Sequence, residues 1–236
     1  MEQTSCKKLL GVKLDESLTF NNHVQFVRQQ LLWKIQILRQ IRLYCSKSLR
    51  MLYYQAFIYP RFVYASSVWS LKNKESMDEL LRVQKQAIRV IADASYLEPS
   101  LPIFLQLKII PIVIQYKINK LILVFKALKH LTPPYLSEKF TRGTETNLYC
   151  TRRSNDNFLF IPKHFSQYSK SFEITGIKLW NSLPSNLRNS PSLGIFKKRV
   201  TDLVFAKLST FSETGDLWCR VCTIDTQLAT LFCSHV

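Results

Sequence analysis

Four residues near the C-terminus have the types, and part of the spacing, of a zinc site. Two residues separate Cys219 from Cys222, and Cys233 and His235 follow. Two thiolates at this spacing can hold a zinc ion, and a second pair completes the tetrahedron. Cys233 and His235 are only one residue apart, however, and structural zinc sites use wider spacing. We therefore interpret the four, the chain's one candidate metal site, as a coincidence and predict no bound metal.

Acidic residues are the second group that could do chemistry. Two-metal nucleotidyl transfer needs carboxylates that converge within a few ångströms. The chain has no Asp-Asp pair, and its Asp-Glu pairs are Asp15-Glu16 and Asp78-Glu79. The first pair falls where a hairpin is expected to turn, and acids are ordinary there. The second begins a helix, where Ser76 and Glu79 fit a capping box.

Other signatures of an active site are absent from the sequence. There is no glycine-rich phosphate loop and no Gly-x-Ser-x-Gly motif, and the four histidines are far apart. The sequence therefore predicts no catalytic residue and no cofactor in this chain.

Basic residues outnumber acidic ones by 33 to 16, which gives a net charge of +17. Such an excess favours a polyanionic partner, because phosphate contacts release counterions and charge steers association. No acid occurs from Ser17 through Lys74, and a helix face with cations alone is suited to phosphates. We predict that nucleic acid contacts seven cations of the helical region: Arg28, Lys34, Arg39, Arg42, Arg82, Lys85 and Arg89.

The elements that must position these cations are mainly helices, since the chain has only five glycines and nine prolines. Apolar residues recur every three or four positions from Val24 to Ile41, which predicts a helix over 24–45. A second helix is expected over 47–59, ended or kinked by Pro60. A third begins at the capping box. Short links between the three predict a helical bundle over 23–95.

Other segments flank this bundle. Residues 9–20 predict a short β-hairpin, which places a first domain at 1–22 and cannot be stable alone. After a linker at 98–102, a second helical region is expected over 96–208, with helices over 112–130, from about 171 and over about 192–208. A short extended strand is expected at 158–162. Residues 209–236 lose the basic bias and are interpreted as a divergent tail.

Two tryptophans raise the question of base stacking, which aromatic side chains provide in single-strand binders. Trp180 has apolar neighbours at Phe172, Leu179 and Leu183, so we predict that it packs in a core. Asn181 and Pro184 are then expected to end its helix. Trp33 lies beside Leu32 in an apolar helix, and we predict that it packs as well.

No segment is predicted to span a membrane. The most apolar run, 101–128, contains Lys108, Pro111, Lys117, Lys120 and Lys126, whereas a spanning helix needs about 20 nearly uncharged residues. The N-terminus lacks the apolar core of a signal peptide. We therefore expect an intracellular chain with reduced cysteines.

Several short motifs, in this order, resemble the C-terminal part of the reverse transcriptase of jockey-like non-LTR (LINE-type) retrotransposons. The segment from Lys8 to His23 is similar to the one that follows the family's polymerase palm. Leu52-Tyr53 through Pro60, Tyr64 and Trp69 are similar to its thumb region, and Gln84-x-x-Ala87-Ile88-Arg89 to the helix after it. Pro134-Tyr135-Leu136, Arg152-Arg153 and Pro162 continue the order, and Trp180-Asn181-Ser182-Leu183-Pro184 with Phe196-Lys197 closes it.

The resemblance covers about residues 8–208 and implies a fragment of an RNA-directed DNA polymerase, with a thumb-like bundle that binds an RNA/DNA template-primer. The family's endonuclease, fingers and palm, with the catalytic aspartates and Mg²⁺, would lie upstream of Met1. We therefore expect the chain to be inactive alone, and nuclear if functional. Seven matching residues are interpreted as structural: Gly11, Asp15, His23, Trp69, Trp180, Asn181 and Pro184.

Two other interpretations stay open at this point. The chain could be a helical protein-interaction module whose charge serves solubility or an acidic protein partner, which predicts an exposed apolar groove. It could also be a relic open reading frame without function.

Overall fold

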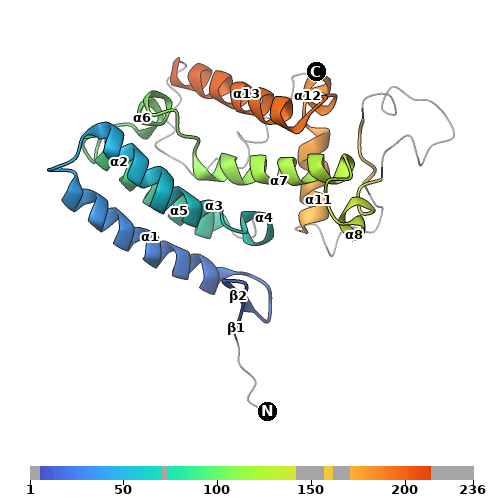
Figure 1. Cartoon of the computed structure of the whole chain (residues 1–236), viewed down its shortest axis with the longest axis horizontal. Helices are drawn as coiled ribbons and strands as arrows, with labels where there is room; N and C mark the ends of the chain where they lie inside the picture. Colours follow the sequence, from blue (N-terminus) through green and yellow to red (C-terminus); the bar gives the residue numbers. More distant parts are fainter. Residues whose placement is uncertain (1–5, 71–73, 142–156, 162–170, 214–236) are drawn as a thin grey trace, which may run out of the picture. The chain divides into compact units, whose positions relative to one another are not determined.

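The computed structural model describes residues 6–70, 74–141, 157–161 and 171–213. A two-stranded hairpin is followed by helices (Figure 1), so the prediction of a mainly α fold with an N-terminal hairpin is confirmed. The chain divides into two compact units, and the described residues fall in 6–116 and in 117–213. In this part of the chain, no helix combines the length and the apolar character needed to cross a bilayer.

The hairpin pairs β1 (Cys6–Leu9) with β2 (Val12–Asp15) in antiparallel register, with Leu9 opposite Val12. The two loop residues, Leu10 and Gly11, have φ angles of 46° and 85°. Positive φ at both positions is the signature of a type I′ turn, whose twist matches that of the strands. Gly11 adopts such a φ at little cost, whereas Leu10 does not. The Tyr64 hydroxyl donates to the Leu10 carbonyl at 2.6 Å and attaches the turn to the helices.

Asp15 organises the loop that leads from the hairpin into the first helix. Its carboxylate accepts hydrogen bonds from the backbone amides of Thr19, at 2.9 Å, and Phe20, at 2.8 Å. Burial alone raises the pKa of Asp15, but the hydrogen bonds from Thr19 and Phe20 outweigh it and hold the pKa well below its ordinary value. Asp15 is therefore a capping carboxylate with both oxygens in use.

The helices of the first unit follow in chain order. They are α1 (Asn21–Ile41), α2 (Lys47–Tyr53), the π-helical turn η1 (Tyr54–Ile58), α3 (Tyr59–Val63), α4 (Ser66–Trp69), α5 (Lys74–Ala92) and α6 (Ser100–Gln106). α7 (Ile112–Leu128) begins in this unit and continues into the second. α1 lies alongside α5 (Figure 1) and buries Leu31, Ile35 and Leu38 completely.

Of the two outcomes expected at Pro60, an end or a kink of the helix, the first does not occur. The helical backbone continues to Val63, and the turn before the proline widens into η1, in which the Tyr59 amide bonds to the Tyr54 carbonyl. A proline cannot donate an amide proton and its ring clashes with the preceding turn. A π-turn relieves that conflict by shifting the hydrogen-bond pattern by one residue.

Three expectations are wrong. Ser76 is not a helix cap, because α5 already begins at Lys74, and its hydroxyl instead contacts the Asn21 side chain at 3.2 Å. The predicted linker at 98–102 contains the start of α6. Trp33 does not pack in the core but is 66% exposed. For Ser76 and for residues 98–102, contacts with other helices outweigh the local sequence pattern. Trp33 differs from its apolar neighbours in the sequence because adjacent residues of a helix point to different faces.

The second unit contains the rest of α7 together with α8 (Pro134–Ser137), α11 (Phe172–Asn181), α12 (Ser185–Arg188) and α13 (Leu193–Glu213). Ser171 caps α11 by accepting from the Ile174 amide, near the predicted helix start. Trp180 is 1% exposed, and its ring lies 5.9 Å from that of Phe196, which stacks on Phe125 at 4.6 Å. The prediction that Trp180 packs in a core is confirmed.

Candidate nucleic-acid interface

α1 and α5 present a polar surface along the line where they lie side by side. At one end Gln25 donates to the Glu79 carboxylate at 2.9 Å, and Arg39 donates to the Gln86 side chain at 3.4 Å further along. The polar residues of the contacts along this line, together with Arg82, Lys85 and Arg89 on the outer face of α5, define the α1–α5 seam: Gln25, Arg28, Arg39, Arg42, Glu79, Arg82, Lys85, Gln86, Arg89 and Asp93.

Two of the seven predicted phosphate contacts form ion pairs across this seam. The Arg28 Nε atom lies 3.7 Å from the Glu79 carboxylate, and the Arg42 Nε atom lies 2.6 Å from that of Asp93. The acids that are absent from the sequence around α1 are thus supplied by α5. Arg28 and Arg42 therefore have less charge to offer a phosphate than their sequence surroundings indicate.

Four more predicted contacts belong to the seam, Arg39 on the line of contact and the other three on the outer face of α5. Arg39 and Arg82 are exposed, and Lys85 and Arg89 are half-buried. Residues 82, 85 and 89 follow one another at spacings of three and four, so they share one face of α5. Arg89 also donates to the Glu98 carbonyl at 2.9 Å, which fixes the loop after α5. Six of the seven predicted cations therefore belong to the seam, three in the contacts between the two helices and three on α5 alone.

Lys34, the seventh, lies on a different side of α1. Its ammonium is 5.5 Å from the centre of the Phe57 ring, and its carbonyl accepts a hydrogen bond from the Tyr53 hydroxyl. Lys34 therefore faces α2 and η1 and does not belong to the seam.

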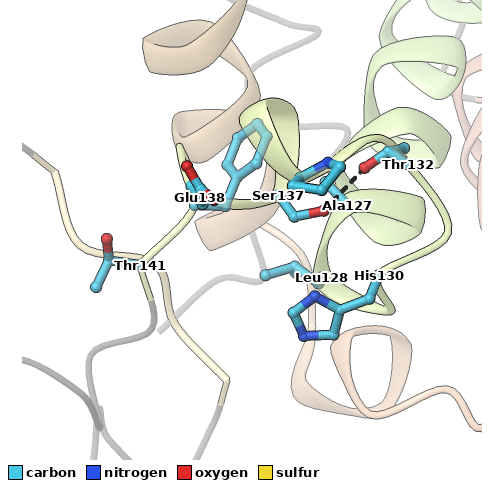
Figure 2. A pocket seen from close by; sticks show the side chains of 9 residues that line it. Ala127, Leu128, His130, Thr132, Ser137, Glu138 and Thr141 are labelled. Carbon is cyan, nitrogen blue, oxygen red and sulfur yellow. Dashed lines mark hydrogen bonds between the residues drawn. The ribbon is translucent and has the colours of Figure 1, made fainter.

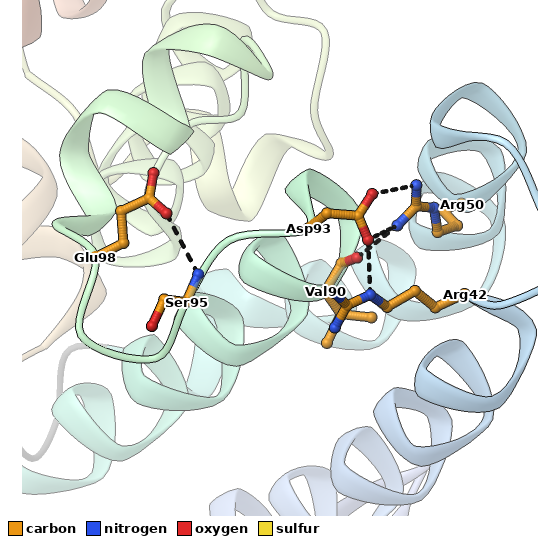
Figure 3. Close-up of polar contacts among 6 residues, drawn as sticks. All are labelled: Arg42, Arg50, Val90, Asp93, Ser95 and Glu98. Atoms are coloured by element: carbon orange, nitrogen blue, oxygen red, sulfur yellow. Dashed lines mark hydrogen bonds and ion pairs between the residues drawn. The ribbon is translucent and has the colours of Figure 1, made fainter.

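Asp93 joins three helices at the far end of the seam (Figure 3). Its carboxylate accepts hydrogen bonds from both terminal nitrogens of Arg50, each at 2.7 Å, and from Nε of Arg42. Arg50 also donates to the Val90 carbonyl. Hydrogen bonds from Arg50 and then Arg42 lower the pKa of Asp93 to about 2. Asp93 has a φ of 59°, a conformation that Asp tolerates better than most residues when it follows a helix.

Replacing Asp93 with Asn should destabilise the first unit by about 2 kcal/mol at neutral pH, because the Arg50 side chain is only 7% exposed and loses its counter-ion. The folded pKa lies below the ordinary value of 3.8, so this contribution is complete above about pH 4 and is lost as the pH falls toward 2. Urea unfolding at pH 7 and pH 2.5 measures the difference between variant and wild type. An equal difference at both pH values would contradict this role of the carboxylate.

His23 and Trp69, two residues of the family motif, are buried against each other. His23 accepts a hydrogen bond from the Lys13 amide through Nδ1, and its ring meets the edge of Trp69 at 5.2 Å. Burial, together with the nearby Lys13, lowers the pKa of His23. The Trp69 indole donates to the Tyr64 carbonyl at 2.9 Å. Both residues attach the hairpin and the short helices to the bundle.

Gln84, from the same resemblance, clamps the backbone that leads into α7. Its side-chain oxygen accepts from the Ile112 amide at 2.7 Å, and its nitrogen donates to the Ile110 carbonyl and to the Tyr54 hydroxyl. Gln84 has no exposed surface. The sequence pointed to Gln84 only as part of the Gln84-x-x-Ala87-Ile88-Arg89 motif. A polar residue on the apolar, buried face of α5 could also have indicated a buried hydrogen-bonding role.

The Trp180–Arg188 block forms a second clamp, within the second unit. The Asn181 side chain forms two hydrogen bonds with the backbone of Leu159. It accepts one from the Leu159 amide and donates one to the Leu159 carbonyl, each at 2.9 Å. The Trp180 indole donates to the Asn157 carbonyl at 2.8 Å. Arg188 is buried, bonds to the Leu183 carbonyl and lies 3.9 Å from the centre of the Phe158 ring.

This clamp refines the expectation that Asn181 and Pro184 end the helix. α11 does end at Asn181, but the side chain of Asn181 contacts another segment. Pro184 begins the next helix, and its carbonyl accepts from the Leu187 amide. The block that carries the strongest resemblance therefore stabilises the fold.

A pocket of about 440 Å³ opens in the second unit beside the end of α7 and α8 (Figure 2). Its described lining includes His130 and Glu138 as titratable residues. The hydroxyls of Thr132 and Ser137 lie 3.1 Å apart and bond to each other. No interaction joins His130 to either hydroxyl in the described lining, so the pocket does not assemble a nucleophile and a base.

Asp15 and Glu79, one from each Asp-Glu pair, have partners within the protein. Asp15 caps a loop, and Glu79 is held by Gln25 and Arg28. Within the described ranges, no three His, Cys, Asp or Glu side chains are grouped so as to hold a metal ion. The candidate zinc ligands Cys219, Cys222, Cys233 and His235 lie outside the described residues.

Comparison with known proteins does not assign the chain to a family: no protein-family model, no curated protein and no solved structure matches it significantly.

Proposed function

We propose that the first unit binds nucleic acid along the α1–α5 seam, as the thumb-like, template-primer-binding part of a non-LTR retrotransposon's RNA-directed DNA polymerase. The observation that supports this proposal is the presence of Arg39 where α1 contacts α5 and of Arg82, Lys85 and Arg89 on the outer face of α5, in a chain with a net charge of +17. Nucleic acid would be bound through phosphates, independently of base sequence. Such a role belongs in the nucleus.

The role proposed is binding and not the chemical step. The carboxylates of Asp15 and Glu79 already accept hydrogen bonds from neighbouring side chains or backbone. The family-motif residues Trp69, Gln84 and Asn181 likewise have structural partners. These contacts support the proposal that the residues resembling the retrotransposon family serve to stabilise the fold and do not catalyse a reaction.

Charge removal on the seam tests the proposal. Changing Arg39, Arg82 and Lys85 together to Gln should weaken binding to an RNA/DNA hybrid at least tenfold and flatten its dependence on salt by about one unit per lost contact. A matched variant removes three exposed cations of the second unit, Lys129, Lys197 and Lys198, by the same change to Gln. Fluorescence anisotropy compares the two variants. Equal losses in both would show that net charge, and not the seam, governs binding.

A helical protein-interaction module is the second candidate. It is favoured by four exposed apolar residues around the turn between α1 and α2: Leu43, Tyr44, Leu49 and Leu52. Exposed apolar clusters of this kind are typical of protein contacts. This candidate predicts that the triple seam variant binds the hybrid as weakly as the wild type does, at every salt concentration.

A further inference from the structure

α1 carries aromatic side chains on the face opposite its buried one. Trp33 lies two residues from both Leu31 and Ile35, which are fully buried, and is itself 66% exposed. Phe26 precedes Trp33 by seven residues, or two helical turns, and therefore lies on the same face. Large aromatic side chains are normally among the more buried residues, so the exposure of Trp33 requires an explanation; Phe26, which is half-buried, extends the same face.

Phe26 on this face and Phe57 in η1 each have a lysine as their neighbour. The Lys13 ammonium lies 4.5 Å from the centre of the Phe26 ring, and that of Lys34 lies 5.5 Å from the centre of the Phe57 ring. Phe57 is 52% exposed. We call these residues, with Trp33, the Trp33 surface: Lys13, Phe26, Trp33, Lys34 and Phe57.

The charge around the Trp33 surface differs from that of the seam. α5 supplies the seam with Glu79 and Asp93, which form ion pairs with arginines. The elements that build the Trp33 surface, 6–70, contain only Asp15 and Glu16 as acids, and the Asp15 carboxylate is occupied by the loop it caps. The Trp33 surface therefore contains two lysines and no acid, and it is complementary to a polyanion.

We propose that the Trp33 surface is a stacking platform for the unpaired bases of a single-stranded nucleic acid. Rings that stack on bases, interleaved with cations that contact phosphates, form the binding mode of sequence-tolerant single-strand binders. Phe26 and Trp33 are about 10 Å apart along the helix, which is roughly three nucleotides of a stacked strand. This proposal rests on the proposed function in taking nucleic acid as the ligand. It concerns a different face of α1 from the seam, and a single strand in place of an RNA/DNA hybrid.

The test uses the full chain, a labelled oligothymidylate of about 15 nucleotides and a blunt RNA/DNA hybrid. Trp33→Ala should lower the affinity for the single strand about tenfold and change the affinity for the hybrid less than twofold. The matched control is Tyr135→Ala, since Tyr135 is 69% exposed but belongs to the second unit. It should change neither affinity. Because Trp33 is exposed, both variants should melt at the temperature of the wild type.

A second measurement follows Trp33 directly. Trp69 and Trp180 are buried, and subtracting the emission of a Trp33→Phe variant from that of the wild type isolates Trp33. Oligothymidylate should quench this difference signal. Unchanged emission, or unchanged single-strand affinity in Trp33→Ala while the hybrid still binds, would overturn the platform and leave the seam proposal intact. It would also favour a protein partner for this face. Failure of the wild type to bind either nucleic acid would overturn both proposals.

Discussion

Gln84→Leu should unfold much of the first unit, with a loss of about 3–5 kcal/mol in the free energy of unfolding. The side chain is fully buried and bonds to the Ile112 amide, the Ile110 carbonyl and the Tyr54 hydroxyl. Leucine fills a similar volume but leaves these groups without a partner, and each buried unsatisfied group costs about 1–3 kcal/mol. That loss is a large part of the ~5–15 kcal/mol that stabilises a typical domain.

The measurement is urea unfolding of the full chain followed by circular dichroism. Gln86→Leu is the matched control, because Gln86 lies two residues away on α5, is half-buried and makes only a long contact of 3.4 Å with Arg39. It should cost less than about 0.5 kcal/mol. A loss in Gln84→Leu no greater than in the control would mean that the clamp does not stabilise the bundle.

Asn181→Ala should destabilise the second unit by about 2–4 kcal/mol. Both polar atoms of the side chain bond to the Leu159 backbone, and Leu159 is 4% exposed, so water has little access to the groups left behind. The segment around Leu159 should then detach from α11 before the rest of the unit unfolds.

Hydrogen exchange of the peptide that contains Leu159 measures this detachment directly. Asn186→Ala is the control, since Asn186 is exposed in α12 and the substitution leaves its backbone carbonyl, which accepts from Arg199, in place. Exchange at Leu159 should accelerate in the Asn181 variant alone. If the Leu159 amide stayed as protected as in the wild type, the clamp would be incidental to the fold.

The features that could be predicted from the sequence are those determined by near neighbours. Apolar spacing located α1 and α7, Ser171 marked the start of α11, and the apolar surroundings of Trp180 placed it in a core. Each signal acts within one or two turns of a helix, where sequence spacing translates directly into position.

The misjudged features depend on distant partners. Ser76, for example, contacts the start of α1 and does not cap α5. The cations of α1 looked unaccompanied because Glu79 and Asp93 lie 50 or so positions further along the chain. Trp33 is the exception, since its offset of two residues from Leu31 already indicated the exposed face.

The pattern of motif residues gives the resemblance a physical meaning in this chain. Gly11 forms a tight turn, Asp15 caps a loop, and Gln84 and Asn181 clamp backbone that is remote in sequence. All of these roles stabilise structure. The proposed contact with nucleic acid, in contrast, would depend on surface cations whose exact positions matter less, because phosphates are bound through charge.

Binding of the wild-type chain to a primer-template RNA/DNA hybrid across a salt titration, from about 50 to about 200 mM, tests the central claim most directly. We expect affinity to fall with a log–log slope of about −3, as three to four phosphate contacts require, and the hybrid to be preferred over duplex DNA of the same length. Binding that is weak at low salt, or that does not change with salt, would contradict a nucleic-acid-binding role for the seam.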